Sequence, residues 1–144
     1  NAAKAFSQAL INDRKIFLFG TGHSHMLAEE LFYRAGGLLN IQPILIDELM
    51  LHISASESTE KEREEGLAEK IFSDYAISDN DVIVIISNSG RNGVIVDMAL
   101  LCKEKGVRLL LETGGESPIT LLRLIKEANT DNIFVNLDTA NIIM

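Results

Sequence analysis

The 144-residue chain is long enough for one domain with a sizeable core, and its 47% hydrophobic content argues against a disordered chain. The formal net charge of -8, without a basic stripe along the sequence, disfavours bulk nucleic-acid binding. No apolar run reaches the roughly 18 residues needed to span a bilayer, and no secretory signal is visible. The lone Cys102 is typical of a reducing compartment. We therefore expect a cytoplasmic protein with neither a nucleic-acid nor a membrane partner.

The first third of the chain alternates between helical and extended patterns. Residues 2–11 carry one apolar helical face, and residues 16–19 form an apolar run typical of a strand buried on both faces. A helix is then predicted from Ser24 to the glycines at 36–37. Its apolar face is formed by Leu27, Leu31, Ala35 and Leu38. Residues 41–46 are predicted as a strand at or near a sheet edge, because Pro43 has no N–H to donate.

The same alternation continues to the end of the chain. Thr59 and Glu62 have the spacing of a capping box, so a helix is predicted to begin there and to continue to about Tyr75. Further strands are predicted over 82–86, 107–111 and 133–137, and further helices over 92–105 and 117–128. The whole pattern predicts a single α/β domain over 1–144. We expect a three-layer α/β/α sandwich with a five-stranded parallel sheet in the order 2-1-3-4-5.

Two loops rich in glycine and hydroxyl groups, residues 20–24 and 87–92, follow the first and third predicted strands. In the predicted sheet these two strands flank the switch point, where ligands of α/β proteins bind. The loops contain glycine N–H groups and hydroxyls at helix starts, which are suited to a phosphate group. The candidate ligand-binding residues are Gly22, Ser24, Ser87, Ser89, Gly90 and Asn92. The alternative interpretation is that both loops are ordinary turns, in which these residue types are common.

The motifs Gly20-Thr21-Gly22-His23-Ser24 and Ser87-Asn88-Ser89-Gly90-Arg91-Asn92 resemble the sugar isomerase (SIS) domain family, and in particular phosphoheptose isomerases. The resemblance covers residues 1–106. It implies a flavodoxin-like sheet and a phosphosugar ligand, with no cofactor. SIS isomerases use a Glu and a His as acid and base. The resemblance therefore suggests as catalytic candidates Glu48, His23 and His25, with His52 as a further one.

Residues 107–144 resemble a different fold, the xylose-isomerase-like TIM barrels of the sugar epimerase and endonuclease group. That resemblance maps two metal-binding carboxylates onto Glu112 and Asp138. We expect no metal site, because the strands that would carry the other ligands are missing and two carboxylates alone are not selective.

Two resemblances that meet at about residue 106 lead us to expect an engineered chimera of an SIS-type fragment and a TIM-barrel fragment. Such a protein would lack turnover but could retain a phosphate or sugar-phosphate site. The alternatives are a natural SIS-domain phosphosugar isomerase of the aldose–ketose type and a sugar-phosphate-sensing module. An uncovered outer face on the last strand would also favour a homodimer.

Overall fold

The computed structural model describes residues 2–88, 90–112, 119, 122, 123, 126, 129 and 133–136. Its helices are α1 (Ala2–Ile11), α2 (His25–Leu31), α3 (Ala55–Lys61), α4 (Leu67–Asp74) and α5 (Gly93–Glu104). Its strands are β1 (Ile16–Gly20), β2 (Ile41–Ile44), β3 (Val82–Ile86), β4 (Arg108–Glu112) and β5 (Ile133–Asn136). Two short 3₁₀ turns, η1 (Gly22–Ser24) and η2 (Asp47–Leu49), follow β1 and β2.

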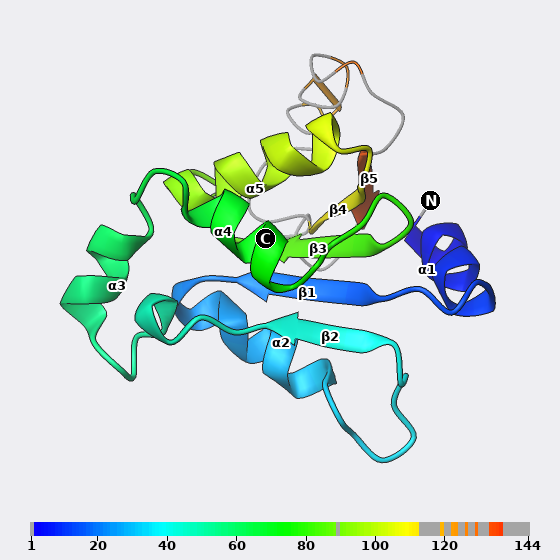
Figure 1. The fold of residues 1–144 in the computed structure, drawn as a ribbon, viewed down its shortest axis with the longest axis horizontal. Helices are drawn as coiled ribbons and strands as arrows, with labels where there is room; N and C mark the ends of the chain where they lie inside the picture. Colours follow the sequence, from blue (N-terminus) through cyan, green and yellow to red (C-terminus); the bar gives the residue numbers. More distant parts are fainter. Residues whose placement is uncertain are drawn as a thin grey trace.

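The strands form one parallel sheet in the order β2-β1-β3-β4-β5, with β1 between β2 and β3 (Figure 1). The predicted α/β class and parallel sheet are confirmed. Pro43 lies on β2 at the edge of the sheet, as its missing N–H required. Gly20 pairs in register with Ile86, so β1 and β3 end at the same level. The loops that follow these two strands therefore leave the sheet from the same edge.

Helices cover both faces of the sheet, because every strand of a parallel sheet needs apolar cover on both sides. One face carries α4 and α5, whose Ile71, Phe72 and Met98 pack with Phe17 and Phe19 of β1. The other face carries α1 and α2, whose fully buried residues in the core cluster are small, while Phe6 and Leu10 of α1 are partly buried against it. These small residues are Ala5, Ala9 and Ala28, packed with Ile16, Leu18, Val82 and Leu110. The predicted helix–sheet–helix layering is thus present within the described residues.

The helix predicted from Ser24 to residues 36–37 is wrong in both its length and its buried face. The chain makes one 3₁₀ turn and then α2, which ends at Leu31. The buried residues of α2 are His25 and Ala28, whereas Leu27 and Leu31 are 55% and 51% exposed. The helix approaches the sheet closely through Ala28, and its large apolar residues point outward.

The capping box predicted at Thr59 and Glu62 is also wrong. Helix α3 begins earlier, at Ala55, and its N-cap is Ser54, whose hydroxyl accepts a hydrogen bond from Glu57 N at 3.4 Å. Thr59 lies inside α3, where its hydroxyl donates to Ala55 O. The predicted single helix is divided at Gly66, which has a left-handed φ of 79° and precedes α4.

No helix in the described part of the chain is long and apolar enough to cross a membrane. Most of the helix predicted over 117–128 lies outside the described residues.

Candidate functional site

The first loop begins with a turn that only glycine allows at residue 20. A Cβ added to Gly20 would stand 2.8 Å from the carbonyl carbon of Ser24, so the loop folds back tightly onto the end of β1. Gly22 has a φ of +55°, and Ser24 N donates to Thr21 O at 3.0 Å. The hydroxyl of the half-buried Ser24 does not cap α2.

The two loops are joined by a side-chain hydrogen bond. Asn92 Nδ2 donates to the hydroxyl of the buried Thr21 at 3.3 Å, which brings together residues 71 positions apart. Asn92 occupies the N-cap position of α5, but its side chain does not cap that helix. The structure therefore brings the first and second loops together, and it assigns Asn92 to the contact between them.

The second loop is shaped by Ser87. Its hydroxyl oxygen accepts a hydrogen bond from Gly90 N at 2.9 Å, and Gly90 has a left-handed φ of 62°. Because this oxygen accepts from the backbone, the hydroxyl proton of Ser87 can be donated outward to a ligand. Ser89 was predicted as a ligand-binding residue, and it lies outside the described residues.

His25 lies under the first loop and is 6% exposed. Its Nδ1 donates to Gly22 O, and its Nε2 lies 3.2 Å from Glu29 Oε1, one turn along α2. The His52 ring stands 5.7 Å from the His25 ring, centroid to centroid. His25 is thus held through both ring nitrogens, and this geometry fixes the carbonyl of Gly22. His23, in contrast, is exposed.

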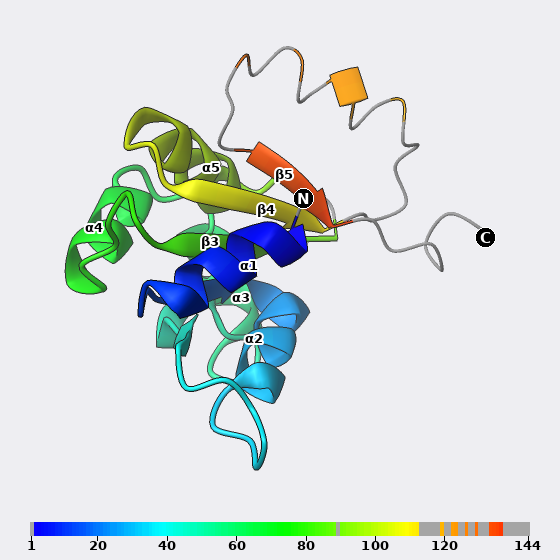
Figure 2. The ribbon, with the colours of Figure 1, turned by 90° about the vertical axis from the view of Figure 1, so that its right-hand side faces the viewer.

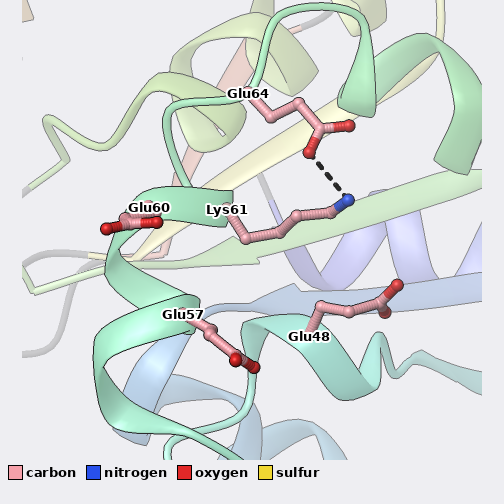
Figure 3. A pocket seen from close by; sticks show the side chains of 5 residues that line it. All are labelled: Glu48, Glu57, Glu60, Lys61 and Glu64. Atoms are coloured by element: carbon pink, nitrogen blue, oxygen red, sulfur yellow. Dashed lines mark ion pairs between the residues drawn. The ribbon is translucent and has the colours of Figure 1, made fainter.

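Glu48 lies near charged residues of α3 and of the connection that follows it. It lies in η2 and lines a pocket of about 270 Å³ together with Glu57, Glu60, Lys61 and Glu64 (Figure 3). Lys61 Nζ is 2.7 Å from Glu64 Oε2, and this hydrogen bond raises the pKa of the Lys61 amine. None of the three histidines lines this pocket.

Within the part of the chain that the structure describes, no group of three or more His, Cys, Asp or Glu side chains could hold a metal ion. The side chain of Glu112 and the whole of Asp138 lie outside the described residues.

Sequence reasoning missed Glu62, which lies between the start of α5 and Gly22 of the first loop. Its main-chain oxygen accepts a hydrogen bond from Val94 N at 2.9 Å, at the start of α5. Its carboxylate Oε1 is 3.9 Å from the point where a Cβ on Gly22 would stand. The only sequence signal for Glu62 was its place in a charged helical stretch, and that signal led to the wrong assignment as a capping residue.

This fold and this pair of loops define an α/β protein with a candidate phosphate-binding site at the carboxyl ends of two adjacent parallel strands. The family model for the SIS domain matches residues 1–111. The chain belongs to the SIS domain family.

Relatives of the chain include members of a family named UPF0309. The protein from Halalkalibacterium halodurans is 49% identical over 115 residues, which are 80% of this chain and 46% of that protein. The protein from Brucella suis is 43% identical over 122 residues, or 85% of this chain and 50% of that protein. The chain thus spans about half the length of the curated relatives it matches.

Among solved structures, the phosphoheptose isomerase from Neisseria gonorrhoeae has a similar fold. Its TM-score is 0.56 at 23% sequence identity, and the alignment covers 98% of this chain and 75% of that one. The SIS-like α/β architecture is therefore shown by structure as well as by sequence.

These comparisons overturn the expectation of an engineered chimera with a junction at residue 106. The SIS match continues to residue 111, and natural bacterial proteins align with 80–85% of the chain. The fold of a single natural protein aligns with 98% of it. The expected TIM-barrel segment at 107–144 finds no support. A β-strand followed by a right-handed crossover occurs in both fold types, so a local resemblance there could not distinguish them.

Proposed function

We propose that this chain is a natural SIS-type protein that binds a sugar phosphate between the loops 21–24 and 87–92. The observation that carries the proposal is the Asn92–Thr21 hydrogen bond, which closes the two loops onto each other at the ends of β1 and β3. Membership of the SIS family supports a phosphosugar as the ligand class. Aldose–ketose isomerisation is the activity we favour, and a sugar-phosphate-sensing role without turnover is the alternative.

In this proposal the second loop supplies the main phosphate contact. The hydroxyl of Ser87 is oriented by Gly90 N, which leaves its proton to be donated to a phosphate oxygen. Gly22 and Gly90 allow close approach of the ligand, and Ser24 and Ser89 stay predicted contacts. His25 takes a positioning role, because both of its ring nitrogens are already occupied.

The proposal is tested by isothermal titration with inorganic phosphate and with glucose 6-phosphate and fructose 6-phosphate as an aldose and a ketose probe. Ser87→Ala removes both the donor and the group that shapes the loop. We expect it to weaken binding of all three probes about 10-fold, as for loss of one hydrogen bond to a charged group.

The matched control is Ser73→Ala on the exposed face of α4, which should bind like the wild type. If the wild-type protein binds none of the three probes, the proposed phosphate site is wrong. Interconversion of glucose 6-phosphate and fructose 6-phosphate by the wild type would support the isomerase, and binding without turnover of these probes would favour the sensing role.

A further inference from the structure

The connection between α3 and α4 passes beside the start of α5 and is fixed there by backbone contacts (Figure 1). Glu62 O accepts the N–H of Val94 at 2.9 Å, so one of the free donors at the beginning of α5 is already used. A Cβ on Gly93 would stand 3.0 Å from the same Glu62 oxygen. A side chain at 93 would crowd this oxygen, and the bond to Val94 ties the backbone of Glu62 to the start of α5, directly after the second loop.

The side chain of Glu62 extends toward the first loop. Its Oε1 lies 3.9 Å from the Cβ position of Gly22. Glu62 is half-buried. One residue from a distant part of the chain is therefore bonded through its backbone to the start of α5, directly after the second loop, and its side chain lies beside Gly22 of the first loop.

A carboxylate in this place selects the part of the ligand that it can face. An ionised carboxylate only accepts hydrogen bonds, so it repels a phosphate group and attracts hydroxyl groups. The phosphate would take the loop N–H and hydroxyl donors. The carboxylate would then face the polyol part of the same molecule.

We propose that Glu62 is a specificity-determining residue that accepts hydrogen bonds from the sugar hydroxyls of the ligand. The inference rests on the proposed function, because it assumes that the phosphate group binds at the two loops. It goes beyond that function by naming the group that distinguishes a sugar phosphate from inorganic phosphate.

Glu62→Gln tests the inference, since it keeps the size of the side chain and the main-chain bond to Val94 while it removes the charge. Titration with inorganic phosphate and with fructose 6-phosphate measures the ratio of the two affinities. We expect Glu62→Gln to weaken fructose 6-phosphate about 10-fold, the loss of a charge-assisted hydrogen bond. Inorganic phosphate should bind as well as before or more tightly, because a nearby negative charge is gone.

Glu65→Gln is the matched control. Glu65 is exposed on the same connection, and its substitution removes the same charge. Equal affinity ratios in Glu62→Gln and Glu65→Gln would overturn the inference while leaving the proposed function intact. Failure of the wild type to bind inorganic phosphate would instead reject the proposed function. Glu62→Asp, which keeps the charge but shortens the side chain, should weaken fructose 6-phosphate selectively and provides the same test if Glu62→Gln does not fold.

Discussion

Cys102 shows how strongly the core of this protein changes the chemistry of a single side chain. It lies on the buried face of α5 and packs in the cluster between the helices and the sheet. Burial raises the pKa of the Cys102 thiol from 9.0 to about 12, because a thiolate would lose its hydration there. Cys102 therefore behaves as a small buried apolar residue. It is a poor candidate for a nucleophile, since the thiolate is the reactive form.

This shift predicts a loss of stability at alkaline pH. The folded pKa lies above the unfolded value, so the contribution of Cys102 is complete below pH 9 and is lost as the pH rises toward 12. Over that window the free energy of unfolding should fall by at most about 1.4 kcal/mol per pH unit from this group. Urea unfolding at pH 8 and pH 10 measures the change. In Cys102→Ala the fall should be smaller, and equal pH dependence in both proteins would contradict the assignment.

At the scale of elements, the sequence predicted strands better than helices. The runs Ile16–Phe19 and Val82–Ile86 are apolar at every position, and only a strand buried on both faces suits them. Helical periodicity was ambiguous in α2, because apolar residues occur on both of its sides and Ala28 carries a weaker signal than Leu27 or Leu31. The smaller Ala28 is the residue that packs on the sheet, because it allows the helix to approach closely. Which face of α2 is buried therefore depends on the packing and cannot be predicted from the helical pattern alone.

The candidate site was also predictable only in part. The two loops could be predicted because glycine and serine at strand ends follow local rules of turn geometry. Glu62 could not be predicted, because its position depends on how the α3–α4 connection crosses the start of α5. The left-handed Gly66 that divides this region into two helices was equally hidden in a pattern that appeared continuously helical.

Substitution of Gly66 tests the break between α3 and α4. A side chain there meets nothing within 4 Å, so Gly66→Ala would introduce strain from the φ of 79° without a steric clash. We expect a loss of about 1 kcal/mol in the free energy of unfolding. Chemical denaturation measures it, with Glu65→Ala, at an exposed neighbouring position, as the control. A stabilised Gly66→Ala would contradict the left-handed conformation of Gly66 before α4.

At the scale of the whole molecule, apolar side chains gather on the outer side of α2 and on the loop at 32–40. This loop projects from the body of the protein (Figure 2). Large side chains here are 43–99% exposed: Met26, Leu27, Leu31, Phe32, Tyr33, Leu38 and Leu39. We call these residues the α2 patch. Exposed apolar side chains gathered in one region of a protein mark interaction sites.

A second copy of the chain is the partner that best suits the α2 patch. Glu30 and Arg34 lie on the same side of this segment and pair with each other. A two-fold interface brings the same surface of both copies together, so the apolar patch of one copy would meet the apolar patch of the other. The homodimer expected from the last strand stays a prediction, but this surface is a better location for it than β5.

We predict that the protein forms a dimer through the α2 patch. Light scattering after size-exclusion chromatography should give twice the 15.9 kDa mass of the chain. The double variant Leu31→Glu with Leu39→Glu should give the monomer mass, because a carboxylate buried in the interface has no partner. Leu100→Glu is the control, since Leu100 is 58% exposed on α5, outside the patch, and its variant should remain dimeric.

A wild-type protein that elutes as a monomer at tens of micromolar, or a double variant that is still dimeric, would show that this surface does not join two copies. Since α2 begins directly after the first loop, a dimer formed in this way would also place the neighbouring copy beside the proposed phosphate site.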